Sequence, residues 1–304
     1  MHSLLHTTKF GRSPHEATVI SWVLPSEPSP TIVALCFAAV VLYARGANHP
    51  EAPSSRQSRW SALSFYLGTA LIYVALQTRF DYLAQHMFWI HRLQHLVLHH
   101  IGPVLICLAA PWAAIAAGVP LPWRGAASRL VNNLPVRSVY YILQQPVVAY
   151  LLFDGLIYFW LWPSIHFRAM LSLHEYECMN WSMAADGLLF WWLMLDPRAR
   201  EQGARMGFGL RIVVVLLAMG PQLVIGAYLS LHRSTLYDVY EVCGRLWPVA
   251  PATDQEIGGL ITWIPASMMS VVVGLILWQR WIRNDDRVRS PSARVAAAES
   301  IASQ

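Results

Sequence analysis

Charged residues are scarce in this chain of 304 residues, where Asp, Glu, Lys and Arg together make up 13% of the sequence. An average soluble domain carries roughly 25%, whereas 56% of this chain is hydrophobic. No alternation typical of strands indicates a barrel, because the apolar runs are continuous and far longer than the roughly 9 to 11 residues of a membrane strand. The sequence therefore predicts an all-α integral membrane protein.

Several other features are missing. Neither an internal repeat nor a second soluble domain is visible, and the four cysteines show no CxxC spacing, so we expect no disulfide framework. The first thirty residues contain no compact apolar region followed by a small-residue cleavage site, which predicts no removable signal peptide. We expect one membrane domain over residues 30–283, with a polar tail at 1–29 and a C-terminal tail at 284–304.

Long uncharged runs supply the membrane helices, each of which needs roughly 20 mostly apolar residues. The chain contains seven such runs, which predict a bundle of about seven transmembrane helices. They lie at 30–44, 60–78, 86–110, 139–162, 170–195, 210–231 and 257–281.

Basic residues indicate the orientation of this bundle. If seven helices alternate, fifteen basic residues fall on the side of the C-terminal tail and six on the other side. Positive charge is retained on the cytoplasmic side, so the C-terminus should be cytoplasmic and the N-terminus outside. The arginines that set this topology beside membrane lipid then account for the basic pI, and no nucleic-acid partner is required.

The stretch "QHMFWIHRLQHLVLHH" at 85–100 places five histidines in an apolar segment. At roughly 100° per residue, His91, His95 and His99 should lie on one face of a continuous helix, with His86 and His100 on the opposite side. Two imidazoles at positions i and i+4 are able to bind one metal ion. A single membrane histidine more often forms a hydrogen bond between helices than binds a metal, so the roles of His86, His99 and His100 stay open.

A second stripe with the same spacing contains Met170, His174 and Cys178. Thioether, imidazole and thiolate are soft or borderline ligands, which suit Cu(I) and, to a lesser extent, zinc. The expected topology places both stripes in the outer half of the membrane. We therefore take His91, His95, His174 and Cys178 as candidate metal ligands.

Three segments resemble motifs of the polytopic CtaG-type cytochrome c oxidase assembly proteins, and the similarity extends over most of the chain. "HRLQHLVLHHIGP" resembles an H-M-x-Q-H segment followed by apolar residues and Pro, and "HEYEC" resembles H-x-x-E-H. "DQEIGGLITW" resembles the D-Q-x-x-G-G segment and Trp that open the family's last helix, and it is the most specific match. These matches include Asp254, Gln255 and Trp263.

The departures from the family pattern bear on the metal site. Arg92 replaces the usual Met, Cys178 stands where the family usually has His, and Leu161 stands where a W-H-x-P segment would have another His. A four-histidine site therefore cannot be carried over whole, although Cys178 would shift the preference toward Cu(I).

The resemblance implies a non-enzymatic assembly factor in the bacterial cytoplasmic membrane that handles or delivers copper, as Cu(I), for a haem-copper oxidase. Its partners would be the oxidase subunit with the catalytic copper centre and a copper chaperone. The candidate ligands named above would hold copper, Glu177 would orient an imidazole, and Asp254 with Gln255 would form a structural clamp that includes Trp263.

Alternatives from other classes remain. A haem-binding membrane protein could use His91 or His95 with His174 as axial ligands. "HLVLHH" fits one H-x-x-x-H-H box of a membrane di-iron oxygenase, but such enzymes need several boxes and no second one is present. A metal permease is disfavoured, because the inner halves of the predicted helices are nearly free of polar residues.

Overall fold

The structure is a computed structural model that describes residues 29–48 and 59–289. The described residues form helices and contain no strand. The predicted N-terminal tail lies outside the described residues apart from Ser29, as does the C-terminal tail beyond residue 289. The main helices are α2 (Pro30–Ala47), α3 (Arg59–Gln77), α4 (Arg79–His86), α5 (Phe88–Leu96), α6 (Gly102–Leu108), α7 (Trp112–Gly118), α8 (Leu121–Val131), α9 (Leu134–Leu143), α10 (Pro146–Leu161), α11 (Pro163–Leu171), α12 (Leu173–Leu195), α13 (Phe208–Leu217), α14 (Met219–Leu231), α15 (Val239–Val242) and α16 (Pro251–Arg289). Two short elements are the π-turn η2 (Val97–Ile101) and the 3-10 turn η3 (Arg200–Gln202).

Each of the seven predicted apolar runs falls on one to three of these helices. Within the described residues, four helices are long and apolar enough to cross a membrane by length and composition, namely α2, α3, the helix over Phe208–Leu231 and α16. The number rises to six if two bent pairs, α5–α6 with α7 and α9 with α10, each form one span. The all-helical membrane architecture is confirmed at this level, while the count of seven spans and the orientation stay predictions.

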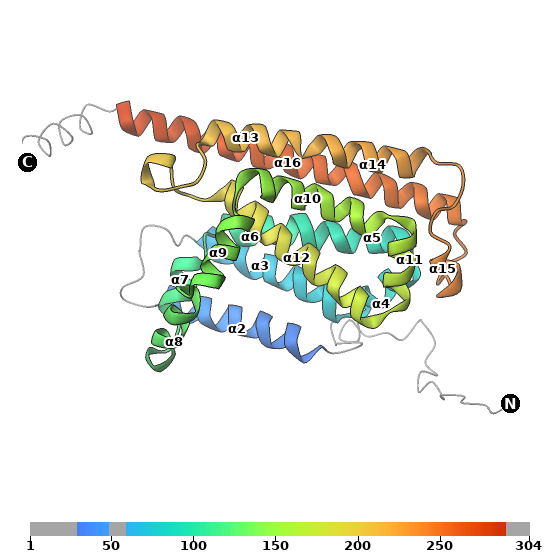
Figure 1. Cartoon of the computed structure of the whole chain (residues 1–304), viewed down its shortest axis with the longest axis horizontal. Helices are drawn as coiled ribbons and strands as arrows, with labels where there is room; N and C mark the ends of the chain where they lie inside the picture. Colours follow the sequence, from blue (N-terminus) through green and yellow to red (C-terminus); the bar gives the residue numbers. More distant parts are fainter. Residues whose placement is uncertain (1–28, 49–58, 290–304) are drawn as a thin grey trace, which may run out of the picture.

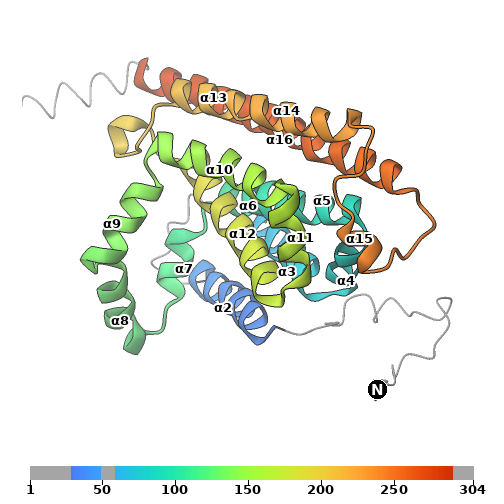
Figure 2. The same ribbon diagram turned by 45° about the vertical axis from the view of Figure 1, so that its right-hand side comes forward.

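The helices lie in layers (Figure 1). Helices α13, α14 and α16 run side by side along one edge, and α2 lies on the opposite edge. Between them are α3, α5, α6, α10 and α12, while α4, α11 and α15 gather at one end. Figure 2 shows α7, α8 and α9 at the other end. The inward faces of the central helices provide the interior in which polar groups are held.

The predicted continuous helix over 86–110 is broken in two places. Met87 adopts an extended conformation that separates α4 from α5, so His86 belongs to α4 and not to the helix that carries His91. Five residues further along are wound as the π-turn η2, between α5 and α6. Both irregularities change which side chains face the interior, and both lie within the histidine-rich stretch.

An apolar core packs between α10, α12 and the π-turn η2. Phe153 on α10 stacks on Phe190 of α12 with ring centroids 3.7 Å apart, and Trp191 packs edge-on against both. Trp191 is fully buried and donates from its indole nitrogen to the carbonyl of His99, 2.9 Å away. The core thus fixes α10 and α12 against the π-turn.

Candidate functional site

Helix α5 begins against the carboxylate of Asp254, the fourth residue of α16. The backbone N–H groups of Phe88 and Trp89 donate to the two oxygens of Asp254, at 3.1 and 2.8 Å. Arg245 also donates to this fully buried carboxylate. An acidic group at a helix N-terminus satisfies otherwise unpaired N–H groups and favours the helix dipole. Asp254 therefore sets where α5 starts, one turn before its first histidine.

His91 and His95 form a buried imidazole pair on α5. Their Nε2 atoms are 3.0 Å apart, and both side chains are at most 1% exposed. Arg92 donates from Nη1 to Nδ1 of His95 at 3.3 Å. Because arginine only donates, His95 then carries its proton on Nε2 and donates to His91. Both imidazoles are neutral in this arrangement, and Nε2 of His91 accepts the hydrogen bond that Nε2 of His95 donates.

Arg92 is held in place by α16. Its Nε donates to the hydroxyl of Thr262 at 3.0 Å, and its side chain is 4% exposed. Gly258, on the same face of α16, allows the close approach, since an added Cβ there would lie 2.4 Å from a ring carbon of Phe88. The residue that departs from the family motif is thus a buried cation that orients the pair.

A third imidazole, His166 on α11, reaches the same place. Its ring lies edge-on to His91 with centroids 5.2 Å apart. Nδ1 of His166 donates to the carbonyl of Trp160 at 3.0 Å, which leaves Nε2 to accept from the hydroxyl of Tyr240 at 2.9 Å. Burial lowers the pKa of His166 to about 3, so this imidazole is also neutral. Sequence reasoning missed it, because a single histidine in "WPSIHF" has no i, i+4 partner.

Three polar side chains close the pair on the side of α12 and α4. Tyr176 packs edge-on against His91 with ring centroids 5.9 Å apart, and its hydroxyl donates to Asp81 at 2.8 Å. Gln94 donates to Asp81 at 2.6 Å and lies 3.2 Å from the same hydroxyl. The phenol of Tyr176, the amide of Gln94 and the carboxylate of Asp81 are therefore hydrogen-bonded to one another and cover this side of the imidazoles.

The π-turn η2 brings both His99 and His100 into the interior, contrary to the prediction that they face opposite sides. His99 lies 3.1 Å from a carboxylate oxygen of Asp186 on α12. His100 lies 3.2 Å from the side-chain oxygen of Gln222 on α14, and both imidazoles are at most 3% exposed. A π-turn adds one residue to a helical turn, which rotates the following side chains.

The hydrogen-bond network around His99 and His100 lies next to the histidine pair. Gln222 donates to Asp154 on α10 at 3.1 Å, which extends the network to a third helix. A cavity of about 10 Å³ is lined by Arg92, His95, His99 and His100 among other residues. That volume is close to the least that holds one water molecule.

The structure does not assemble the predicted ligand set. His174 and Cys178 are exposed on α12, whereas His91 and His95 are buried within the bundle. Within the described residues, no group of three or more His, Cys, Asp or Glu side chains has the arrangement needed to hold a metal ion. Glu177 is exposed as well. The proposed roles of these residues stay predictions.

The other predicted structural residues, Gln255 and Trp263, hold α16 against α14 and the loop that follows it. Gln255 is buried and accepts from the backbone N–H of Leu236 at 2.7 Å, while its amide nitrogen faces the carbonyls of Leu229, His232 and Ser234 at 3.2 to 3.4 Å. It fixes the loop after α14 to the start of α16. Trp263 packs against Gly226, where an added Cβ would lie 2.4 Å from the indole. Both residues join α14 to α16.

The distance between the imidazoles tests whether they fit a metal ion. Bonds of about 2.0 Å to two nitrogens place those atoms about 3.3 Å apart at a tetrahedral angle and about 4 Å apart in line. The Nε2 atoms of His91 and His95 are 3.0 Å apart, so a small displacement of one ring would open the space for an ion. Nε2 of His95 carries a proton while Nδ1 accepts from Arg92, so metal binding would require that proton to leave Nε2 and the hydrogen bond from Arg92 to be released. A third ligand, Nε2 of His166, would first have to release Tyr240.

Comparison with known proteins identifies the family. The model of the cytochrome c oxidase caa3 assembly factor family matches residues 38–284. An uncharacterized protein of Mycobacterium leprae is 25% identical over 209 residues, which cover 66% of this chain and 31% of that protein. An uncharacterized protein of Mycobacterium bovis is 26% identical over 220 residues, which cover 70% of this chain and 32% of that protein.

The chain thus spans about a third of the length of the curated relatives it matches. No solved structure matches it significantly. The family match includes the buried imidazoles, the π-turn and the start of α16, and it covers well over half of the sequence. The chain belongs to the cytochrome c oxidase caa3 assembly factor family.

Proposed function

We propose that this protein is a copper-handling assembly factor for a haem-copper oxidase, and that His91 and His95 hold the copper ion. The observation that carries this proposal is the buried pair of neutral imidazoles, whose Nε2 atoms converge at 3.0 Å. Neutral imidazole is a ligand for copper. Copper in this role is cargo, and no covalent chemistry on a substrate is required of the protein.

The surroundings suit reversible binding. Arg92 adds a positive charge beside the pair, which favours a monovalent ion over a divalent ion because repulsion grows with the charge. Its hydrogen bond to Nδ1 of His95 would be released when copper binds and would form again when copper leaves. His166 offers a third nitrogen, held back by Tyr240 at 2.9 Å. A site with two ligands and a third in reserve would release its ion more readily than a closed site of four.

The partner would be the oxidase subunit with the catalytic copper centre, which would take the ion by ligand exchange. A copper chaperone is a further partner by the same reasoning. We place the histidine pair in the outer half of the bacterial cytoplasmic membrane, as the distribution of basic residues indicates. A strain without the protein should retain the oxidase polypeptide in its membrane but with less copper and less activity.

The test is metal analysis of protein purified without chelator, together with an optical spectrum. We expect the His91→Gln, His95→Gln double variant to lose bound copper, because the amide is a poor soft-metal ligand. His174→Gln is the matched control, since this imidazole is exposed. Copper lost equally in both variants would favour the predicted set with His174, and a Soret band in the native protein would favour haem.

A further inference from the structure

Met170 pairs with a different residue from the one that its spacing in the sequence suggested. The stripe of Met170, His174 and Cys178 requires one continuous helix, but Ser172 adopts an extended conformation between the end of α11 and the start of α12. Helical spacing therefore pairs Met170 with His166, which lies four residues earlier on the same face of α11. A thioether and an imidazole come together there, and both are ligands for Cu(I).

The hydroxyl of Tyr240, at α15, lies between these two ligands. It is 2.9 Å from Nε2 of His166 and 4.0 Å from the sulfur of Met170, so the nitrogen and the sulfur are at most about 7 Å apart. The hydroxyl has one proton, and Nε2 of His166 accepts it. The thioether is only a weak acceptor, so the lone pairs of its sulfur stay available to a soft cation.

His166 is prepared to bind a metal ion through Nε2. Its Nδ1 donates to the carbonyl of Trp160 at 3.0 Å, and a carbonyl in this position commonly orients an imidazole that ligates a metal. In contrast to His95, this imidazole needs no change of tautomer. The ring is fully buried and lies edge-on to His91 with centroids 5.2 Å apart. His166 thus connects Tyr240 with the histidine pair.

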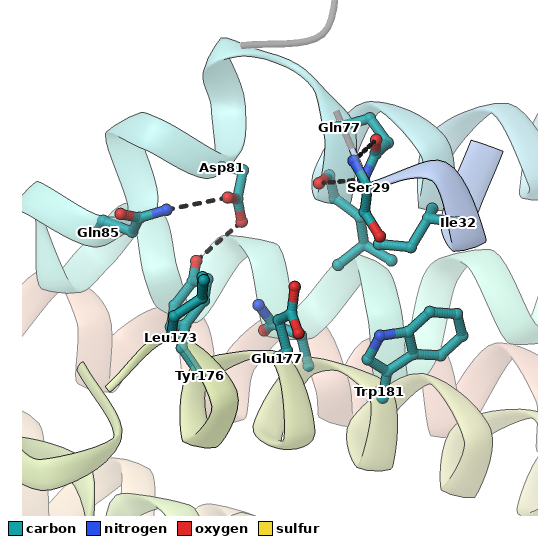
Figure 3. Close-up of a pocket in the computed structure, with 11 residues that line it drawn as sticks. Ser29, Ile32, Gln77, Asp81, Gln85, Leu173, Tyr176, Glu177 and Trp181 are labelled. Atoms are coloured by element: carbon teal, nitrogen blue, oxygen red, sulfur yellow. Dashed lines mark hydrogen bonds between the residues drawn. The ribbon is translucent and has the colours of Figure 1, made fainter. Parts of the chain in front are cut away.

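The surroundings of Met170 suit Cu(I) better than another approach to the pair. Met170 is half-buried at the end of the bundle where α4, α11 and α15 gather (Figure 1). A cavity of about 300 Å³ reaches Tyr176 from α3 and α4, but Figure 3 shows its Asp81 hydrogen-bonded by Gln85 and Tyr176. Carboxylate and amide oxygens in that lining suit hard cations. The thioether therefore offers the softer path.

We propose that Met170 and His166 form an entry site for Cu(I), in which the ion displaces the hydroxyl of Tyr240 before it passes to His91 and His95. The inference rests on the proposed function, because it supplies the route to that pair. Each step exchanges one neutral ligand for another, so copper stays Cu(I) and no electron is transferred. The hydroxyl of Tyr240 closes the entry site while no ion is present, and the thioether selects a soft cation.

Tyr240→Phe separates this role from a structural one, because it removes the hydroxyl and keeps the ring. The assay is the initial rate of copper uptake by the full-length protein in lipid nanodiscs, with Cu(I) presented as a weak complex and the final copper content measured separately. The ion no longer replaces a hydrogen bond of about 1 kcal/mol, so uptake should be about fivefold faster at unchanged final content. Tyr237→Phe is the matched control and should keep the native rate, since this buried phenol donates to the carbonyl of Leu161.

Met170→Leu keeps the volume of the side chain and removes the sulfur. It should slow uptake at least about tenfold without changing the final content, because even the outer partners of a metal site change affinity by about 10–100-fold. Met268→Leu is the matched control, since that thioether is 63% exposed on α16. Combined with His91→Gln and His95→Gln, Tyr240→Phe should hold added Cu(I) at the entry site, where copper K-edge absorption should detect a sulfur scatterer that Met170→Leu removes.

The outcomes separate this inference from the proposed function. Wild-type protein that takes up no copper overturns the proposed function, and the entry site falls with it. Normal final copper with equal uptake rates in Tyr240→Phe and Tyr237→Phe, or in Met170→Leu and Met268→Leu, overturns the entry site alone. So does the absence of a sulfur scatterer in the combined variant. A fall in final copper for Met170→Leu, to the level of the histidine double variant, makes the thioether a ligand of the resting site and also overturns the entry role.

Discussion

Asp254→Asn should destabilise the bundle strongly, although it changes one atom. The buried carboxylate accepts from two N–H groups at the start of α5 and pairs with Arg245. An amide has one oxygen to accept with, and its nitrogen would face a backbone donor. The variant therefore loses one charge-assisted hydrogen bond and leaves the guanidinium without its partner.

The magnitude follows from these two losses. A hydrogen bond to a charged group contributes about 1.5–3 kcal/mol, and removing one partner of a buried ion pair costs about 3–5 kcal/mol. The side chain of Arg245 is 14% exposed, so water recovers part of the second loss. We expect a decrease of about 3 kcal/mol in the free energy of unfolding.

The assay is reversible unfolding in mixed detergent micelles, followed by circular dichroism. Glu256→Gln is the matched control, because Glu256 is exposed two residues further along α16. A double-mutant cycle with Arg245→Met should give a coupling of about 1–3 kcal/mol, since the two side chains are in contact. Equal stability of Asp254→Asn and Glu256→Gln, or a coupling near zero, would refute the capping role.

Three further predictions concern packing, protonation and exposure. Gly187→Ala should cost about 3 kcal/mol or more in a thermal-stability assay, because an added Cβ would lie 2.6 Å from a carbonyl oxygen of the π-turn, whereas Gly155→Ala, with nothing within 4 Å, should be neutral. Burial lowers the pKa of His166 to about 3, so between about pH 6.5 and pH 3 only the unfolded state binds this proton. The free energy of unfolding should therefore fall as the pH falls through that range. His166→Gln should reduce this pH dependence by up to about 1.4 kcal/mol per pH unit. A maleimide should label exposed Cys178 but not buried Cys107, and Cys178→Ser should keep its copper; loss of copper in that variant would support the thiolate as a ligand.

Much of the fold could be predicted because it depends on composition over long windows. A run of about 20 apolar residues needs a membrane or a core wherever it lies, and all seven runs became helices. The pairing of His91 with His95 also followed from helical periodicity, since both lie in the same regular segment, α5. Local spacing within one intact helix is information that a sequence carries directly.

The remainder depended on backbone breaks and on contacts between distant segments. The extended residue Met87 and the π-turn η2 interrupt the period on which the assignment of His99 and His100 rested. His166 meets His91 through tertiary packing alone, and no periodic pattern marks it. The i, i+4 stripe of His174 and Cys178 was read as a site, yet both face outward, because periodicity identifies a face but not what covers it.

These irregularities have a common consequence for the site. In a straight helix through residues 86–108, His99 and His100 would point about 100° apart. The π-turn turns both toward polar partners, Asp186 and Gln222. The break at Met87 exposes N–H groups to Asp254, which joins the pair to α16. The backbone thus departs from a regular helix on both sides of the buried pair, at Met87 and at η2, and each departure gives polar groups a partner, which leaves His91 and His95 in the regular stretch between them.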